Sequence, residues 1–549
     1  MTSRTCWRNP YGRVMKVASQ VIFSLRESDI CVASDIFAFS KCDIFCLGKK
    51  FWKGFEILFG EVVMNFSIIR RTLGALLIFE AIFFLVPAIT AVCYREWNEL
   101  AAFGVSIAVC ALVGWLCVFK KPKNTEMYAK EGFAIVALSW IAMSLFGSLP
   151  FMLIGKTSFV DALFETVSGF TTTGASIFDG QQIDQMSKSL LMWRSFTHWV
   201  GGMGVLVFII AFLPLSGAQN MHMMKAESPG PIVSKLVPKV RQTAIILYVI
   251  YFVMTMIQVV MLLFGNMNLF EALATAFATA GTGGFSVSSK GMNYSPYIQI
   301  VVTVFMLLFS INFNSYYLLL KRKPREAFTE EVRTFLIIVF SAILAVTLNV
   351  YFAGNIGDSF GTTLRNAAFS VSSIISTTGF STVDFSIWPF FSTMVLLLLM
   401  FIGGCAGSTC GGMKVSRWVI LGKGGMNEVG RLIHPKQVKK IIVDGRKVDH
   451  EVVRSVNSYL IVYFLIFAVS IFIISFDGAI PSGDFMTAFS SVAATLNNVG
   501  PGIGPIVGPA GEFGDFSALS KFVYIFDMLA GRLELFPMLV LFSPKAWRR

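Results

Sequence analysis

Residues 158–176 read SFVDALFETVSGFTTTGAS: a polar start, an apolar stretch, and then a small, hydroxyl-rich loop that contains a glycine. A helix needs about 20 apolar residues to cross a bilayer, and the apolar stretch here, 159–170, is shorter and semi-polar. Such a stretch fits a re-entrant half-helix, because irregular backbone is tolerated at membrane depth only where protein or water surrounds it.

This pattern occurs four times in the chain. Three further short stretches, 268–280, 362–375 and 483–495, also run into a loop with a glycine at the same place. The four loops read Phe170-Thr-Thr-Thr-Gly174-Ala-Ser, Ala280-Gly-Thr-Gly-Gly284-Phe-Ser, Ile375-Ser-Thr-Thr-Gly379-Phe-Ser and Leu496-Asn-Asn-Val-Gly500-Pro-Gly. Neighbouring glycines are roughly a hundred residues apart, which leaves room for two spans and a half-helix in each repeat.

The half-helices carry their own start signals. Ser158 with Asp161 and Asn268 with Glu271 fit a helix cap followed by an acid, and Ser482 is followed by Asp484. Acidic residues at a helix N-terminus complement the helix dipole, so the partly negative C-terminal end is directed toward the glycine loop. A cation would be stabilised there.

The rest of the chain is that of an integral membrane protein. Of its 549 residues, 55% are hydrophobic and 14% charged, and the mean hydropathy is +0.70, more apolar than a soluble core requires. Ten spans are predicted, at 68–92, 100–119, 132–154, 189–214, 242–265, 297–320, 333–353, 387–412, 455–475 and 520–543. We therefore predict an all-α polytopic membrane protein, with four repeated span, half-helix, loop and span units around a central pore and two extra N-terminal spans.

The predicted organisation follows from these elements. It comprises an extension (1–63), two N-terminal spans (64–125), pore repeat one (126–220), repeat two (221–325), repeat three with a gating loop (326–425) and repeat four (426–549). The extension holds Cys6, Cys31, Cys42 and Cys46, lacks a signal-peptide pattern and is predicted to be disordered or mis-annotated translation upstream of Met64. Cys42 and Cys46, without histidine partners, are only a weak metal or redox pair.

The net charge of +13 comes from 45 Lys and Arg residues against 32 Asp and Glu residues. Most of the basic residues fall in loops on one side of the predicted spans, and the largest group lies at 414–454. Basic loops remain cytoplasmic, so both termini are predicted to be cytoplasmic. The charge is thereby explained by membrane topology, and no nucleic-acid partner is expected.

The four loops have the chemistry of a cation filter. Backbone carbonyls can replace the hydration shell of an ion when successive peptides point the same way, and such a backbone needs a residue tolerant of positive φ, which glycine supplies. Close helix packing by small residues is the alternative, but it explains one or two such loops better than four. The candidate ion-binding residues are Thr172, Thr173, Gly174, Thr282, Gly283, Gly284, Thr377, Thr378, Gly379, Asn498, Val499 and Gly500.

Several motifs carry a family resemblance over roughly residues 64–545. They are Ser168-Gly-Phe-Thr-Thr-Thr-Gly174, Trp199-Val-Gly-Gly-Met-Gly204, Gly403-Gly-Cys-Ala-Gly-Ser-Thr-Cys-Gly-Gly-Met-Lys414, Asn497-Asn-Val-Gly-Pro-Gly502 and Gly531-Arg-Leu-Glu534. On these residues the chain resembles the TrkH/Ktr/HKT superfamily of potassium transporters, and its two extra spans resemble the bacterial TrkH branch. The resemblance implies potassium uptake across the bacterial inner membrane, potassium as substrate without a cofactor, a homodimer in membrane lipid, and a cytoplasmic TrkA-type nucleotide-binding regulatory protein.

A gate is predicted in the span that starts near 387. Five glycines, Gly403, Gly404, Gly407, Gly411 and Gly412, lie within ten residues of one another, a density that a continuous helix tolerates poorly. The resemblance implies an intramembrane gating loop here, and helix packing is the alternative. Arg532 lies within the last predicted span, where burying a charge in the membrane is costly and therefore indicates a specific role. It is predicted to oppose cation passage, or else to form a structural ion pair.

Two departures from the family pattern concern the second repeat. Its loop reads Ala-Gly-Thr-Gly-Gly where a more hydroxyl-rich stretch is expected, and the next span contains Phe309-Ser-Ile-Asn-Phe-Asn314 where small residues are expected. Both leave the aligned Gly284 in place but bear on ion selectivity. His198 is expected to be a packing or hydrogen-bonded residue and not a ligand, and Met221-His222-Met223-Met224 to be a solvated or interfacial run and not a copper site.

Other functions remain open at this stage. A sodium-coupled or weakly selective cation transporter shares every feature named so far, since sequence does not measure selectivity. A membrane-embedded enzyme would need a catalytic motif, and the chain has neither His-Glu-x-x-His nor a nucleophile motif. A solute symporter would show paired broken spans and not four half-helix loops.

Overall fold

Helices form nearly all of the computed structural model, which describes residues 64–120, 129–204, 240–353, 359–435, 439–481 and 484–547. All of these belong to one compact unit, Met64–Trp547. The extension 1–63 and the Met221–Met224 run lie outside the described residues.

Six helical segments among the described residues are long and apolar enough to cross a membrane. The first is α3 (Phe66–Phe83) joined to α4 (Leu85–Tyr94), and α6 (Ala129–Gly147) is similarly joined to α7 (Leu149–Ile154). The others are α5 (Trp97–Phe119), α13 (Val240–Phe264), α18 (Glu330–Ala353) and α22 (His450–Ile474). The all-helical, multi-span class predicted from the sequence is confirmed.

Four shorter helices occupy the predicted half-helix positions. They are α8 (Phe159–Phe170), α14 (Leu269–Gly281), α19 (Phe360–Ile375) and α23 (Phe485–Leu496). Ser158 and Asn268 cap α8 and α14 as expected, by accepting hydrogen bonds from the amides of Asp161 and Glu271. Ser359 caps α19 and Asp484 caps α23, whereas Ser482 lies outside the described residues.

The helix that closes each repeat is short, and the prediction of continuous spans at 297–320 and 520–543 was wrong. The second repeat ends in α15 (Pro296–Ser310) and α16 (Phe313–Leu320), bent by 92° at a break where Asn312 caps α16. The fourth ends in α24 (Ala518–Arg532) and α25 (Phe536–Phe542), separated where Glu534 and Leu535 adopt positive φ. A polar cap and left-handed backbone interrupt these otherwise apolar runs.

The first and third closing helices also end early. Helix α10 (Lys188–Gly202) ends at two consecutive glycines, and the rest of the predicted span 189–214 lies mostly outside the described residues. Helix α20 (Phe390–Ile402) stops at Gly403, and α21 (Val415–Ile433) begins after an irregular segment, 403–414. The break predicted from the glycine density is thus present.

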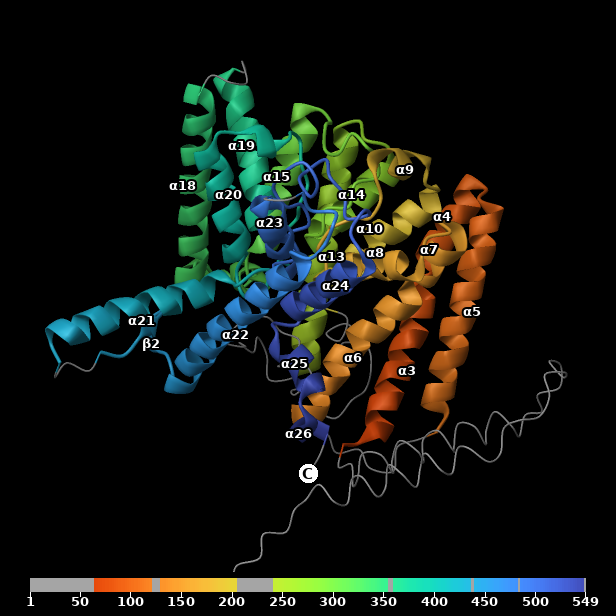
Figure 1. The fold of residues 1–549 in the computed structure, drawn as a ribbon, viewed down its shortest axis with the longest axis horizontal. Helices are drawn as coiled ribbons and strands as arrows, with labels where there is room; N and C mark the ends of the chain where they lie inside the picture. The colour runs from red at the N-terminus through yellow and green to blue at the C-terminus, as the bar shows by residue number, and fades with distance from the viewer. Residues whose placement is uncertain are drawn as a thin grey trace, which may run out of the picture. The chain divides into compact units, whose positions relative to one another are not determined.

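Small elements join these helices. They are α9 (Gly180–Gln185), α17 (Pro324–Ala327), the 3₁₀ turn η1 (Phe385–Ile387), α26 (Pro544–Trp547) and an antiparallel hairpin of β1 (Ile442–Val443) and β2 (Arg446–Lys447). Helix α21 projects sideways from the lower end of α18 (Figure 1).

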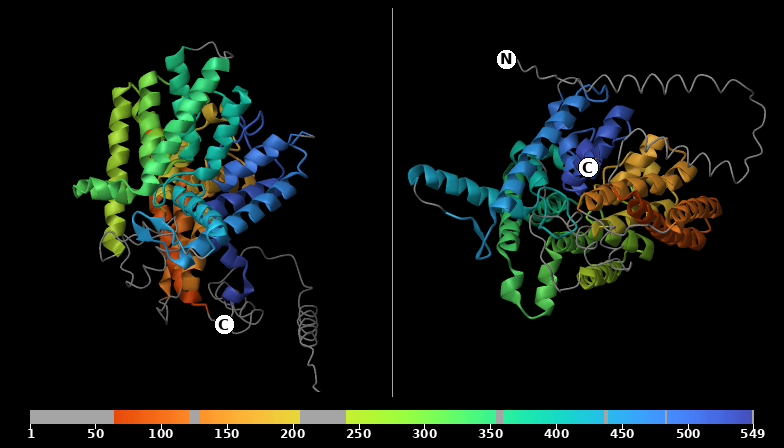
Figure 2. Two further views of the ribbon diagram at one scale, coloured as in Figure 1. Left: turned by 90° about the vertical axis from the view of Figure 1, so that its left-hand side faces the viewer. Right: turned by 90° about the horizontal axis from the view of Figure 1, so that it is seen from below.

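The four half-helices and the helices that follow them contact one another in cyclic order. The closing helix of each repeat contacts the half-helix of the next: α10 packs on α14, α15 on α19, α20 on α23, and α24 returns to α8. Figure 1 shows α8, α10 and α24 between the long helices α18 and α5, which lie at opposite sides, and Figure 2 gives two further views of the same arrangement. The four loops that follow the half-helices are thereby brought to the middle of the unit.

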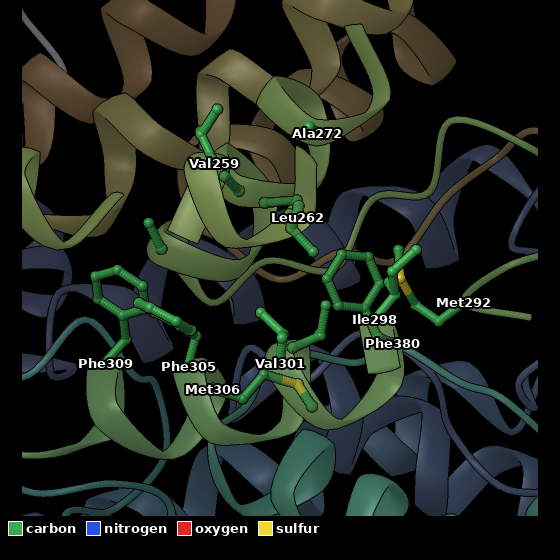
Figure 3. Close-up of a cluster of buried hydrophobic side chains, with 14 of the residues drawn as sticks. Val259, Leu262, Ala272, Met292, Ile298, Val301, Phe305, Met306, Phe309 and Phe380 are labelled. Carbon is green, nitrogen blue, oxygen red and sulfur yellow. The ribbon is translucent and has the colours of Figure 1, made fainter. Parts of the chain in front are cut away.

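An apolar cluster holds the second and third repeats together. Val259 and Leu262 of α13 face the α15 row that includes Ile298 and Val301, and all four are buried (Figure 3). Phe380, which directly follows Gly379 in the third loop, is 2% exposed and belongs to this cluster. A fully buried aromatic side chain stabilises by about 1.5–3 kcal/mol relative to an exposed one, so Phe380 anchors its loop to the neighbouring repeat.

Candidate functional site

The loops after the four half-helices share an unusual backbone. The residue two before the aligned glycine has a positive φ in each loop: 58° at Thr172, 56° at Thr282, 54° at Thr377 and 54° at Asn498. The aligned glycines follow with φ of 83°, 76°, 81° and 100° at Gly174, Gly284, Gly379 and Gly500. Alternation of left-handed and ordinary residues turns successive carbonyls toward one side, and glycine adopts it without steric cost. We call these segments, 171–174, 281–284, 376–379 and 497–500, the ring loops.

The ring loops touch one another in cyclic order. A Cβ atom at Gly174 would lie 1.8 Å from the carbonyl oxygen of Gly283, and one at Gly284 would lie 1.9 Å from that of Thr378. At Gly379 it would lie 2.3 Å from the Val499 oxygen, and at Gly500 2.6 Å from the Thr173 oxygen. Each aligned glycine thus packs against a carbonyl oxygen of the next loop, and the glycine of the fourth loop packs against the first loop.

Two buried side-chain oxygens of the ring loops lack a hydrogen-bond partner among the described residues. The Thr172 and Asn498 side chains are fully buried, yet Thr172 Oγ1 and Asn498 Oδ1 have no hydrogen-bond partner among the described residues. A buried oxygen without a partner is costly, about 1–3 kcal/mol, unless something else satisfies it. Asn498 Nδ2 is fully used, because it donates to Thr173 Oγ1 and to the Met528 carbonyl. Asn498 is thereby fixed between the first ring loop and α24.

The arginine of a buried ion pair in the first predicted repeat also contacts the second. Arg194 of α10 and Glu165 of α8 lie 2.7 Å apart, and their side chains are 1% and 0% exposed. Arg194 also donates to Ser176 Oγ and to the Ser286 carbonyl, so the two segments that follow the first and second ring loops share one guanidinium. Removal of one partner of a buried pair typically costs 3–5 kcal/mol.

A second link between these repeats lies outside the spans. The backbone amide and hydroxyl of Ser289 donate to the Asp184 carboxylate, the amide at 2.9 Å. The Ser289 hydrogen bonds lower the pKa of Asp184, because they favour its charged form. The segments after the first and second ring loops are thus tied at two places.

The irregular segment 403–414, which we call the glycine-rich loop, lies against the ring. The amide of Gly411 donates to Thr377 Oγ1 at 2.7 Å, and a Cβ at Gly411 would lie 2.3 Å from the Asn497 carbonyl oxygen. Gly403, Gly407 and Gly412 have φ of 70° to 71°, values that favour glycine. Gly404 lies against Cys410, because a Cβ there would come 2.7 Å from Cys410 Sγ.

Glu331 holds both ends of the glycine-rich loop. Its Oε1 atom accepts hydrogen bonds from the amides of Ala406 at 2.7 Å and Ser416 at 3.0 Å. No sequence feature indicates this role, because Glu331 resembles an ordinary acidic residue in the first turn of a span.

Two cationic side chains occupy the other side of the glycine-rich loop. Arg532 donates to the carbonyls of Thr409 at 2.8 Å and Gly202 at 2.7 Å, and also to Gly201. Lys414 is 2% exposed, and its ammonium donates to the carbonyls of Cys410 and Gly411. Arg532 therefore joins the glycine-rich loop to the end of α10. Glu534 pairs elsewhere, with Arg417.

Arg532 and Lys414 both line a cavity of about 720 Å³, a volume that includes its open mouth. Among the described residues, its lining includes Arg532, Lys414, Trp140 and glycines of the loop. The guanidinium of Arg532 lies 5.7 Å from the centre of the Trp140 ring, close enough for a cation–π contact. A water-accessible space lined by two fixed cations thus adjoins the glycine-rich loop.

The site residues named from the sequence fall into two adjoining groups. The structure brings the twelve ring-loop residues together, and it brings Gly403, Gly404, Gly407, Gly411, Gly412 and Arg532 together beside them. Sequence reasoning missed Lys414, Glu331 and the Arg194–Glu165 pair. The last could have been suspected from two charges inside apolar helices.

Comparisons with known proteins agree with this architecture. A family described as TrkH, cation transport protein, matches residues 98–549. The Trk system potassium uptake protein TrkH of Escherichia coli K12 is 36% identical over 495 residues, covering 88% of this chain and 100% of that protein. TrkH of Halomonas elongata is 34% identical over 496 residues, with the same coverage.

A solved structure is similar over the same extent. The crystal structure of the potassium transporter TrkH from Vibrio parahaemolyticus matches with a TM-score of 0.77 at 35% identity, covering 88% of this chain and 100% of that one. These relatives are transporters and not enzymes. The matched family model and the identity over whole relatives show that the chain belongs to the TrkH family of cation transport proteins.

Proposed function

We propose that this chain takes up potassium ions across the bacterial cytoplasmic membrane, with the ring loops as selectivity filter and the glycine-rich loop with Arg532 as an intramembrane gate. The closed circle of glycine-to-carbonyl contacts among Gly174, Gly284, Gly379 and Gly500 carries this proposal. Potassium is proposed as the ion because the similar proteins are potassium uptake proteins and a potassium transporter.

The filter would work by replacing water. A potassium ion that enters the membrane loses its hydration shell, and carbonyls fixed in one direction offer equivalent ligands. The carbonyls of Thr173, Gly283, Thr378 and Val499 are held against neighbouring backbone, so they need little rearrangement when the ion arrives. The C-terminal ends of the four half-helices add partial negative charge on the same side.

The gate would repel cations by fixed positive charges and obstruct their path with the glycine-rich loop. A charge about 5–8 Å from a passing ion is worth a few kcal/mol at an effective dielectric near 20. Arg532 and Lys414 place two such charges on the glycine-rich loop. Opening would require Arg532 to release Thr409 and the loop to move away from Thr377.

The assembly belongs to the same proposal. The chain would act as a homodimer within membrane lipid, with both termini cytoplasmic and with a TrkA-type nucleotide-binding protein on the cytoplasmic side. The four pore repeats would span 126–220, 221–325, 326–425 and 426–549. Helix α21 and the β1–β2 hairpin lie within the most basic loop region of the sequence, 414–454, which supports that orientation.

Growth and flux test the function together. The chain, expressed in a bacterium without its own potassium uptake, should restore growth at low external potassium. In proteoliposomes, the purified protein should take up potassium or rubidium faster than sodium. Equal potassium and sodium uptake would instead support a weakly selective cation transporter, and potassium uptake that requires sodium would support a sodium-coupled one.

A further inference from the structure

The second ring loop lacks a side chain that the other three possess. The residue directly before the aligned glycine is Thr173, Thr378 or Val499 in the other loops, but it is Gly283 in this one. Gly283 is not among the residues with positive φ, so its backbone conformation does not require glycine. Something other than backbone strain must account for the missing side chain.

The imidazole of His198 occupies the space where that side chain would be. A Cβ atom at Gly283 would lie 2.1 Å from His198 Nδ1, 2.3 Å from Cγ and 2.5 Å from Cε1. Gly281, two residues earlier, is equally close to the backbone of His198, because a Cβ there would lie 2.2 Å from its carbonyl oxygen. Two glycines of the second loop are thus in direct contact with one histidine of α10.

His198 also connects the first and second repeats by hydrogen bonds. Its Nδ1 lies 2.8 Å from the carbonyl oxygen of Gly169 in α8, and the amide of Phe285 donates to Nε2 at 3.3 Å. A carbonyl only accepts and an amide only donates, so the ring is neutral with its proton on Nδ1. The side chain is fully buried, and its ring lies 4.3 Å from that of Phe285.

We propose that His198 is a positioning residue of the filter: its imidazole replaces the side chain absent at Gly283 and fixes the second ring loop relative to the first. The Gly283 carbonyl, which meets Gly174, is then placed by His198. Because discrimination between potassium and smaller cations depends on where such carbonyls lie, His198 contributes to selectivity. This inference rests on the proposed function.

An exchange of the two side chains tests it most sharply. His198→Ala should lower the potassium-to-sodium uptake ratio about tenfold, because a tenfold effect needs only about 1.4 kcal/mol. Gly283→Thr should abolish uptake, because its Cβ would collide with the ring. The double variant, which restores the hydroxyl found at Thr173 and Thr378, should recover much of the ratio. Such recovery would show that positions 198 and 283 are coupled, because two independent substitutions would have additive effects on the uptake ratio.

Conservative variants separate the two hydrogen bonds. His198→Asn keeps an amide donor near Nδ1, and His198→Gln keeps an acceptor near Nε2, whereas His198→Leu keeps only bulk. The ratio should be better preserved in the Gln variant than in the Leu variant, because Gln still accepts from Phe285 beside the filter. Potassium and sodium uptake in proteoliposomes, with assembly checked by gel filtration in detergent, provide the readout.

The outcomes are distinguishable. Equal potassium and sodium uptake by the unaltered chain would defeat the proposed function itself. A selective unaltered chain whose correctly assembled His198 variants keep its ratio would overturn only the inference about His198. Loss of assembly in every variant, the double one included, would also overturn it, since the ring would then be required for folding and not for selectivity.

Discussion

At the scale of single residues, the ring glycines satisfy two constraints at once. Gly379 has φ of 81°, and a Cβ there would lie 2.3 Å from the Val499 carbonyl oxygen and 2.7 Å from Cδ of Pro501. An L-residue in this conformation costs roughly 1–2 kcal/mol before any collision is considered. A side chain at position 379 would therefore strain its own backbone and displace the Val499 carbonyl, which the proposed filter uses.

Gly379→Ala should therefore reduce potassium uptake at least about tenfold, because 1.4 kcal/mol of misplacement suffices for that factor. Gly361→Ala is the matched control in the same repeat, since a Cβ there meets nothing within 4 Å. Rubidium uptake into cells measures both. Normal uptake by a Gly379→Ala protein that is present in the membrane would exclude this loop from the ion path.

Arg532 gives the second prediction at this scale. Arg532→Ala removes the donor to Thr409 and Gly202 and should raise basal potassium flux about tenfold, since a charge near the path is worth a few kcal/mol. Arg532→Lys, which keeps the charge but loses the fork of donors, should give an intermediate flux. Arg446→Ala, in the exposed hairpin, is the control.

Proteoliposome flux without the regulatory partner is the measurement for these variants. Unchanged flux in a correctly folded Arg532→Ala protein would reduce Arg532 to a structural side chain and leave the glycine-rich loop as the whole gate.

The residues that the sequence did not reveal are those whose contacts leave no sequence pattern. Glu165 and Arg194 form a pair, and His198 fills the gap at Gly283, but neither relation leaves a periodic pattern. The ring glycines could be found because each one follows a capped half-helix at a fixed place. Local chemistry was therefore predictable, whereas the pairing of side chains from different helices was not.

At the scale of elements, the half-helices were predicted to within a few residues. Caps such as Ser158 and Asn268 mark their starts, and the glycine loops mark their ends. The breaks in the closing helices after Ser310 and Arg532 were missed, because hydropathy averaged over a span hides one polar cap or a two-residue turn. The break at Gly403 was predicted because a continuous helix tolerates five glycines within ten residues poorly.

The attachment of the glycine-rich loop gives a prediction at this scale. Glu331→Ala leaves the amides of Ala406 and Ser416 without their acceptor, which should cost about 1–3 kcal/mol of stability per buried group. It should also raise basal flux several-fold, because the loop is freed at both ends. Glu326→Ala is the control, since Glu326 is 58% exposed and pairs only with Lys323 on the surface.

Thermal unfolding in detergent and flux in proteoliposomes together decide this case. A lower unfolding temperature with unchanged flux would show that Glu331 stabilises the fold without restraining a gate.

At the scale of the whole molecule, the main feature is that the contacts between short helices form a closed circle. Each closing helix packs on the next half-helix, and the fourth repeat returns to the first through α24 and α8. The same order recurs among the ring loops, where Gly500 meets Thr173. The proposed ion pathway would therefore need all four ring loops, and no single loop could form it.

The extension gives a prediction at this scale. Deletion of residues 1–63 should leave potassium uptake intact, because the relatives match over their whole length with 88% of this chain and every site residue lies after Met64. Growth of a potassium-uptake-deficient strain at low potassium checks this. Loss of uptake with normal membrane insertion would give the extension a role in transport.

The central claim is that the four ring loops hold the transported ion together. Thallium, which substitutes for potassium and scatters anomalously, should give a peak on the ring axis in crystals of the protein, within reach of the carbonyl oxygens of Thr173, Gly283, Thr378 and Val499. A clear thallium peak elsewhere in the unit, with none inside the ring, would contradict the account.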